Sequence, residues 1–211
     1  MANQRNYEVT NQLLLDSAKT AFLANGFKDT KLRDICRQAN LTTGAFYKHF
    51  KSKDELLEKL VAPFLEELQA SYLNQINPAI ANMTAANLSE LFLTKILNMD
   101  DLIHQIYQNP EIAELLLFKT NGSKYNNLAE LITKFFADNI IRAIEAMLDQ
   151  GFLAANFELN RRQIHFLVYS NTATFYDILK HSYSETETIS LYQNLCNFNY
   201  YGWLDFLGIK K

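Results

Sequence analysis

The sequence predicts an all-α protein, and three observations lead to this prediction. Its 211 residues include three prolines and six glycines, so few residues interrupt helices. Apolar residues recur every three or four positions along most of the chain, as they do on one face of a helix. No segment shows the alternation of apolar and polar residues typical of a half-buried strand. With 48% apolar residues the chain can bury a substantial core.

The first predicted helix spans residues 10–25. Leu14, Ala18 and Phe22 recur there on one face, and Gly26 ends the helix. This apolar stripe offers a surface on which the short helices that follow can pack.

Residues 30–53 indicate two short helices joined by a tight turn. Thr30 is the expected N-cap of the first helix, and Asn40 stands at the turn because Asn tolerates a left-handed backbone. Thr42 or Thr43 can cap the second helix. This is the geometry of a helix-turn-helix. The side chains left on the outer face of the second helix are small, hydroxyl-bearing or cationic: Thr43, Ala45, Tyr47, Lys48 and His49.

Basic residues concentrate in the same part of the chain. Residues 28–53 contain seven Lys or Arg against two Asp. Residues 1–60 have a net charge of +3 and residues 61–211 one of −6, which together give the total of −3. A solvated helix surface explains any one of these cations. The combination indicates contact with phosphates by one domain of a weakly acidic protein.

The next helix is expected to begin after Ser52. The Ser52 side chain can cap it while Glu55 reaches back, as in a capping box, and Lys53 with the free backbone amides would offer a second phosphate site. Pro63 removes a backbone donor and crowds the preceding turn. Either the helix kinks at Pro63 or a new helix begins there.

Breakers place further helices along the rest of the chain, for about nine in total. They are expected at residues 64–75, 85–97, 102–108, 111–119, 125–150, 161–181 and about 185–207.

Several residues in the amino-terminal part carry a family resemblance. They are Phe22, Gly26, Phe27, Thr30, Asp34, Ile35, the run LTTGAFYKHF at residues 41–50 and the run SKDEL at residues 52–56. In this order they resemble the DNA-binding domain of TetR-family transcriptional regulators, and the resemblance covers about the first quarter of the chain. Two departures are visible, since the family usually has Gly at Asn40 and Ala at Cys36. Both are conservative for the turn and its packing.

The resemblance implies a division of labour along the chain. Residues 1–51 would form a helix-turn-helix DNA-binding domain, and residues 52–211 a larger helical ligand-binding and dimerisation domain. Thr42, Tyr47 and His49 match positions that touch the DNA backbone, and Thr43, Ala45 and Lys48 match those nearest base edges. The expected DNA-binding residues are Thr30, Lys31, Thr42, Thr43, Gly44, Ala45, Tyr47, Lys48, His49 and Lys53.

The same resemblance implies a repressor that binds an inverted-repeat operator in double-stranded DNA as a homodimer. The last two predicted helices contain more apolar residues than a terminal hairpin needs, which suggests a second burial partner; simple protomer core is the alternative. In the family these helices form a four-helix dimer interface. The expected interface residues are Phe175, Leu179, Tyr192, Leu195, Phe198 and Trp203.

An unknown small-molecule effector, apolar or aromatic, would release the operator. Aromatic or polar groups that interrupt apolar stripes are candidates for its site, because a buried polar group needs a partner and a ligand can be one. The candidates are His104, Tyr107, Phe118, Tyr125, Asn171 and Phe175. Ordinary core packing is the alternative for each of them.

No motif indicates an enzyme, a cofactor or a metal. The chain has no Gly-rich phosphate loop, no Gly-x-Ser-x-Gly and no His-Glu-x-x-His. A structural metal held by His104 and His165 with acidic residues stays an alternative. Cys36 and Cys196 lie on apolar stripes and are expected to be buried thiols, with a redox pair as the alternative.

The sequence also predicts a soluble, cytoplasmic protein. It has no run of ~20 apolar residues and no charged and then apolar leader. A ligand-binding or carrier protein on the same scaffold, without sequence-specific DNA readout, is the alternative function.

Overall fold

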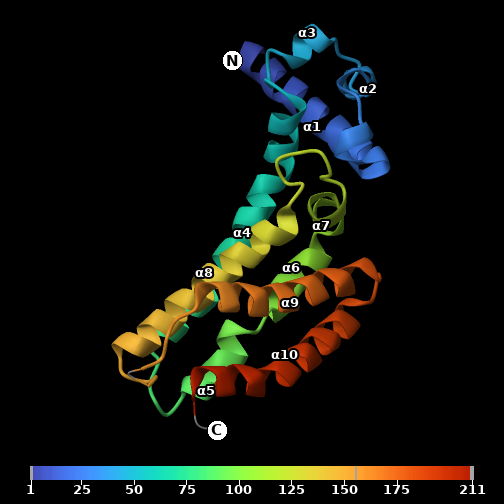
Figure 1. Cartoon of the computed structure of the whole chain (residues 1–211). Coiled ribbons are helices and arrows are strands. Elements are labelled where there is room, and N and C mark those ends of the chain that lie inside the picture. Colours follow the sequence, from blue (N-terminus) through green and yellow to red (C-terminus); the bar gives the residue numbers. More distant parts are fainter. Residues whose placement is uncertain (1, 155, 210–211) are drawn as a thin grey trace. The chain divides into compact units, whose positions relative to one another are not determined.

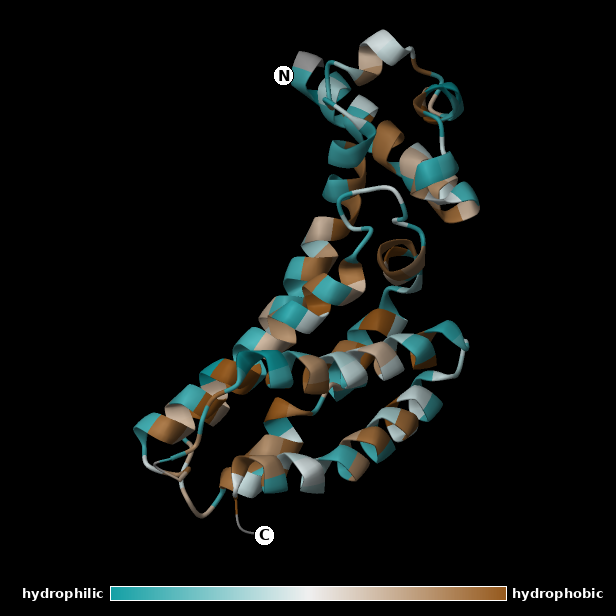
Figure 2. Cartoon of the chain, viewed as in Figure 1, coloured by the Kyte–Doolittle hydropathy of each residue, from teal (hydrophilic) through white to brown (hydrophobic). Residues whose placement is uncertain are grey.

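The computed structural model describes residues 2–154 and 156–209, and within these ranges the chain is helical with no strand (Figure 1). The all-α prediction is therefore confirmed. Figure 2 shows hydrophilic and hydrophobic residues alternating around most helices, as expected for amphipathic elements. In the described ranges no helix combines the length and the apolar composition needed to cross a bilayer.

The chain forms two compact units. The first comprises the residues up to Leu68 together with Ile106–Leu128, and the second comprises Gln69–Gln105 and the residues from Ala129 onward. These units are defined by packing and not by function. The predicted division into a DNA-binding domain (residues 1–51) and a ligand-binding and dimerisation domain (residues 52–211) therefore stays a prediction.

The first unit contains α1 (Ala2–Asp29), α2 (Leu32–Gln38), α3 (Thr43–Phe46), the beginning of α4 (Lys53–Ala81) and α7 (Pro110–Phe118). The fully buried residues of its core come from α1 to α4 and from α7, and they include Leu14, Phe22, Ile35, Phe46, Leu56 and Leu115. The helix-turn-helix arrangement is thus packed on the apolar stripe of α1, as the sequence predicts.

Helix α1 is longer than predicted, because it begins at Ala2 rather than at residue 10. Residues 3–9 are mostly polar, and their two large apolar side chains, Tyr7 and Val9, do not form a stripe that would reveal a helix. Gly26 interrupts α1 with φ 74° and ψ 162°, a backbone conformation that side chains other than hydrogen rarely allow. The predicted stop at Gly26 therefore corresponds to a kink, after which the helix resumes for three residues.

Helix α7 belongs to the first unit because it is tied to α1. The Lys19 ammonium forms an ion pair of 2.6 Å with the Glu111 carboxylate. Beyond the end of α7, the Phe27 amide donates a hydrogen bond of 2.8 Å to the Lys119 carbonyl. The end of α1 is thus fixed to the chain after α7.

Helix α4 is continuous through Pro63 as far as Ala81. No new helix begins at Pro63, and the separate helix predicted for residues 64–75 is wrong. The start is as predicted: the Glu55 amide donates to Ser52 Oγ at 3.1 Å. The Glu55 carboxylate accepts from the Lys51 amide at 2.6 Å rather than from the amide of Ser52.

The second unit contains the rest of α4, α5 (Leu88–Leu91), η1 (Phe92–Ile96), most of α6 (Asp100–Gln108) and of α8 (Leu128–Asp149), α9 (Arg161–Lys180) and α10 (Glu185–Leu207). The helix predicted for residues 85–97 is in part wrong. It starts late because Thr84 and Asn87 bond each other's amides with their side chains, which competes with helix formation. It then widens into the π-helix η1.

Helices α9 and α10 form the hairpin that the sequence predicts (Figure 1). Asn160 caps α9, and Ser184 and Glu187 form a reciprocal capping box at the start of α10. Gly208 ends α10 with φ 67°. Local capping residues thus account for boundaries that differ from the predicted ones by one residue at most.

Candidate nucleic-acid interface

The turn between α2 and α3 is fixed by hydrogen bonds within six residues. Asn40 adopts φ 55°, as predicted. The Leu41 amide donates to the Cys36 carbonyl at 2.8 Å, and the Asn40 amide donates to the Arg37 carbonyl at 3.1 Å. These two bonds are those of a Schellman motif, which satisfies the last carbonyls of α2 and reverses the chain.

Helix α3 is a single turn whose outer side is polar. Thr42 is its N-cap and accepts from the Ala45 amide at 3.1 Å, so Thr42 rather than Thr43 is the cap. Phe46 is buried, whereas Tyr47 is 62% exposed. The predicted DNA-binding residues that lie exposed are Lys31, Thr42, Thr43, Gly44, Tyr47 and Lys48, and Ala45 and His49 are half-buried. Lys51 is also exposed beside them and was not among the predicted residues.

Gly44 contributes an open surface rather than a strained backbone. A Cβ atom at Gly44 would approach only Thr42 Oγ1, at 3.7 Å, which is an ordinary contact. The fold itself therefore does not require glycine at this position. The missing side chain lets another molecule approach the α3 backbone closely.

His49 is held by an aromatic contact that the sequence did not indicate. Its ring stacks on Tyr7 with centroids 4.1 Å apart and an angle of 25° between the planes. No described group bonds the buried Nδ1. Burial lowers the pKa of His49, and the Lys48 charge lowers it further. The amino-terminal turns of α1 thus lie against residues 40–51, which we call the recognition turn.

The Thr30 hydroxyl and the Lys53 ammonium both donate hydrogen bonds to backbone carbonyls. Thr30 is 4% exposed, and its hydroxyl donates to the carbonyls of Ala21 and Gly26 at 3.1 and 2.6 Å. The structure therefore contradicts the Thr30 side chain as a DNA contact. Thr30 is also not the N-cap of α2, a position that Lys31 takes without a side-chain bond.

The Lys53 ammonium lies inside the corner between α1 and α2. It donates to the carbonyls of Phe27 and Thr30 at 2.5 and 2.8 Å and lies 4.2 Å from the centre of the Phe27 ring. Burial lowers the pKa of Lys53, while Asp54 and Asp29 oppose that change. The Lys53 ammonium, which the sequence assigned to a phosphate, thus donates to two backbone carbonyls instead.

The predicted effector residues are distributed over both units. Tyr107, Phe118 and Tyr125 belong to the first unit, and His104, Asn171 and Phe175 to the second. The three of the second unit have separate partners: His104 Nδ1 lies 2.7 Å from Glu185, Asn171 Oδ1 accepts from Asn199 at 2.7 Å, and the Phe175 ring packs on Tyr192. In the first unit Tyr125 is buried, and burial raises the pKa of its hydroxyl.

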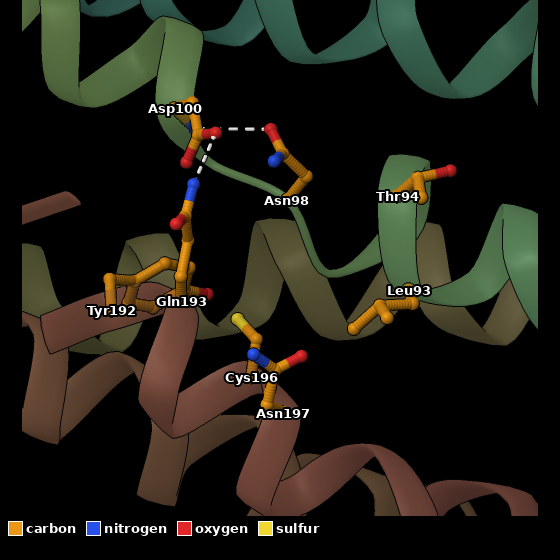
Figure 3. A pocket seen from close by; sticks show the side chains of 8 residues that line it. All are labelled: Leu93, Thr94, Asn98, Asp100, Tyr192, Gln193, Cys196 and Asn197. Carbon is orange, nitrogen blue, oxygen red and sulfur yellow. Dashed lines mark hydrogen bonds between the residues drawn. The ribbon is translucent and has the colours of Figure 1, made fainter. Parts of the chain in front are cut away.

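A pocket of about 190 Å³ opens elsewhere in the second unit (Figure 3). Its lining residues come from η1, the start of α6 and α10: Leu93, Thr94, Asn98, Asp100, Tyr192, Gln193, Cys196 and Asn197. None of the predicted effector residues is among them.

The predicted interface residues divide into two groups. Phe175, Tyr192 and Trp203 are buried within the protomer, and Trp203 packs on Phe92 with ring centroids 5.6 Å apart. These three are therefore core residues, contrary to their assignment. Phe198 is 84% exposed, and Leu179 and Leu195 are half-buried. The apolar residues that α9 and α10 leave exposed are Phe166, Leu167, Tyr169, Leu191, Phe198 and Tyr201.

Among the described residues, no group of three His, Cys, Asp or Glu side chains could hold a metal ion. Both cysteines are free and buried, as predicted. Burial raises the pKa of Cys36 and raises that of Cys196 to about 11, which disfavours the thiolates that a redox pair would need.

Comparison with known proteins agrees with this geometry. Residues 14–60 match the family model described as bacterial regulatory proteins, tetR family. The chain is 25% identical over 155 residues to the HTH-type transcriptional regulator SrpR of Pseudomonas putida, covering 72% of this chain and 67% of that one. It is 29% identical over 125 residues to the HTH-type transcriptional repressor KstR2 of Rhodococcus jostii, covering 58% of this chain and 57% of that one.

A solved structure supports the fold over nearly the whole chain. It is the putative TetR-family transcriptional regulator from Syntrophomonas wolfei, with a TM-score of 0.56 and 18% identity, covering 92% of this chain and 95% of that one. At this identity the likeness extends to the fold alone.

Proposed function

Because the chain is a TetR-family transcriptional regulator, we propose that it represses transcription by binding a double-stranded DNA operator through the turn at residues 40–51. The observation that carries the proposal is the exposed outer side of α3. It presents hydroxyls, a cation and a residue without a side chain, on a turn that hydrogen bonds hold in place. Rigid presentation of such groups is what reading a major groove requires.

The residues of α3 and its turn would divide into two roles. Thr42, Tyr47 and His49 would contact the phosphate backbone and fix the register. Thr43, Ala45 and Lys48 would lie nearest the base edges, where a Lys can donate to guanine. Gly44 would allow close approach, and Lys51 would add a phosphate contact that the sequence did not suggest.

Lys53 would act on DNA binding as a positioning residue. Its ammonium connects the Phe27 and Thr30 carbonyls to the first residue of α4, immediately after the capping Ser52. The Phe27 amide is in turn bonded to the Lys119 carbonyl. A shift at the end of α7 would therefore reach the segment that follows the recognition turn.

The operator-bound form would be a homodimer. Helices α9 and α10 leave six large apolar residues exposed, and burying such a patch against a second copy would stabilise an isologous pair. Two recognition turns related by a two-fold axis would read an inverted repeat with half-sites about one helical turn apart.

An apolar or aromatic effector would release the operator by preferring the protomer arrangement that binds DNA less well. Such a ligand shifts the equilibrium only by its differential affinity, typically ~1–3 kcal/mol of coupling. Asn171 and Tyr107 are the residues through which we would test this part of the proposal. Substituting either should change effector affinity and leave effector-free operator binding intact.

The decisive experiment measures binding to DNA from the region flanking the protein's own gene. A labelled fragment of this region and a shuffled duplex of equal length are titrated with the wild-type protein and with Lys48→Ala. The wild type should prefer the flanking fragment, and Lys48→Ala should lose part of this preference, about 1–3 kcal/mol if Lys48 reads guanine. Equal binding of both duplexes by the wild type would favour a carrier protein on the same scaffold.

A further inference from the structure

The pocket beside α10 is too small and too polar for a drug-sized apolar effector. Its volume of about 190 Å³ would hold roughly six water molecules at ~30 Å³ each. Pockets for drug-sized ligands span about 300–1,000 Å³ and are mostly apolar. Here three carboxamides, two hydroxyls, a thiol and a carboxylate belong to the eight lining residues. The occupant must therefore be small and must form hydrogen bonds.

The charge of the lining selects the sign of that occupant. Asp100 is the one formally charged residue of the eight, and no Lys, Arg or His lines the pocket. An anion would face the Asp100 carboxylate without a compensating cation, so the pocket disfavours anions. A metal ion is also disfavoured, because the described residues offer no group of three His, Cys, Asp or Glu side chains.

The Asp100 carboxylate accepts fewer hydrogen bonds than its two oxygens allow. Its Oδ2 accepts 2.9 Å from Gln193 Nε2, a neutral donor, as Figure 3 shows. Its Oδ1 is buried and receives no hydrogen bond from any described group. Replacing the neutral Gln193 donor at Oδ2 with an ionised donor would strengthen the hydrogen bond to the carboxylate. Gln193 is exposed on α10, so its side chain can turn aside and admit a stronger donor.

The wall opposite α10 is held in an unusual shape. Leu93 and Thr94 belong to η1, and π-helical turns are rare and often found at functional sites. Side chains from two other helices bond the carbonyls at its end: Tyr72 donates to the Ile96 carbonyl at 3.0 Å, and Cys196 donates to the Leu97 carbonyl at 3.4 Å. Gln75 donates to the carbonyls of Lys95 and Asn98 at 2.6 and 3.1 Å.

These bonds tie four consecutive carbonyls at the end of the π-helix to α4 and α10. Cys196, which forms one of these bonds, also lines the pocket. The pocket is therefore preformed rather than created by the ligand, which lowers the entropy cost of binding.

We propose that this pocket binds a small organic ammonium ion, with the Asp100 carboxylate as its counter-ion and the carboxamide oxygens of Asn98, Gln193 and Asn197 as further acceptors. The ammonium replaces the neutral Gln193 donor with charge-assisted hydrogen bonds to Asp100. The site is separate from the predicted effector residues. The inference does not depend on DNA binding, since its test measures binding directly.

The test uses the full-length protein and ethanolammonium chloride, with sodium acetate and sodium chloride at equal ionic strength as controls. Calorimetry and thermal melting should give saturable binding of ethanolammonium and none of acetate. Asp100→Asn should weaken ethanolammonium binding at least tenfold. Asp101→Asn removes the neighbouring exposed carboxylate of α6, which does not line the pocket, and should leave the affinity unchanged.

A second variant tests the volume without changing the charge. Asn197 is exposed on α10, so Asn197→Trp should fold and fill the pocket while keeping Asp100, and it should also abolish binding. Circular dichroism checks the fold of each variant. The proposal is overturned if ethanolammonium gives no saturable signal up to ~50 mM. That concentration is about ten times a Kd of ~5 mM, which would already be weak binding. It is equally overturned if Asp100→Asn and Asp101→Asn bind alike.

Discussion

The recognition turn at residues 40–51, with the Ser52 cap that follows it, and the α9–α10 hairpin hold their exposed side chains by different means. In the turn, hydrogen bonds between residues close in sequence fix the backbone, from the Schellman bonds of Asn40 and Leu41 to the cap of Ser52. In the α9–α10 hairpin, the side chains that pack into the protomer core determine which other side chains remain exposed. An exposed group in the turn therefore follows from local chemistry. An exposed group in the hairpin depends on what else the protomer packs there.

The largest expected effect tests whether Trp203 belongs to the core of the hairpin. Trp203 is 4% exposed and packs on Phe92 and Phe206. Trp203→Ala should lower the free energy of unfolding by about 3–5 kcal/mol, since a large buried side chain is lost and a cavity remains. Urea denaturation of the purified protein measures this change. A loss below about 1 kcal/mol, the typical value for point mutants, would mean that Trp203 is not a core residue.

Phe198 should behave in the opposite way. Phe198→Asp should leave the protomer folded and weaken self-association by about 2 kcal/mol or more, as at an interface hot spot. Sedimentation velocity over a range of concentrations measures the association. Leu131→Asp is a matched control, because Leu131 is 48% exposed on α8, outside the α9–α10 face. If both variants remain dimers, the interface lies on another surface.

The two regions also differ in how far the sequence predicted them. Asn40, Thr42 and Ser52 were identified correctly because each acts on an amide within three residues or on its own backbone. Phe175, Tyr192 and Trp203 were assigned to the interface because an amphipathic pattern does not distinguish protomer core from dimer core. For the same reason Phe198 could not be separated from them.

Contacts distant in sequence were missed inside the predicted site as well. Nothing in the sequence indicates that the Lys53 ammonium bonds Phe27 and Thr30, or that Tyr7 covers His49. The pocket residue Asp100 was also missed, because an acid at a helix start is common and its neighbours come from α10. Such contacts depend on the tertiary fold, not on a local pattern.

Lys53 offers a third test, because it joins local and distant contacts in one residue. Lys53→Met keeps the aliphatic stem and removes both hydrogen bonds, so two partly buried carbonyls lose their donor. The free energy of unfolding should fall by about 1–3 kcal/mol. DNA binding should weaken for all sequences while the salt dependence stays unchanged. A salt slope smaller by about one unit would instead mean that Lys53 contacts a phosphate.

The smallest expected effect concerns Tyr7, whose ring contacts the recognition turn from the amino-terminal turns of α1. Its stack on His49, at 4.1 Å, should be worth about 0.5–1.5 kcal/mol beyond the buried area. Burial is the main cause that lowers the pKa of His49. Tyr7→Ala uncovers one face of the imidazole, so the pKa of His49 should rise toward its ordinary value, as NMR titration can measure. Affinity for operator DNA should fall at the same time, because His49 loses the contact that orients it.

Tyr183→Ala is the control for this last test. Tyr183 stacks on His181 with centroids 5.7 Å apart, in the second unit, so its removal deletes the same kind of contact away from the turn. It should change neither the pKa of His49 nor the affinity for DNA. An unchanged His49 pKa in Tyr7→Ala would mean that the protein around Phe50, rather than Tyr7, excludes water from the ring. The position of His49 would then depend on contacts close in sequence, in contrast to the exposed residues of the hairpin.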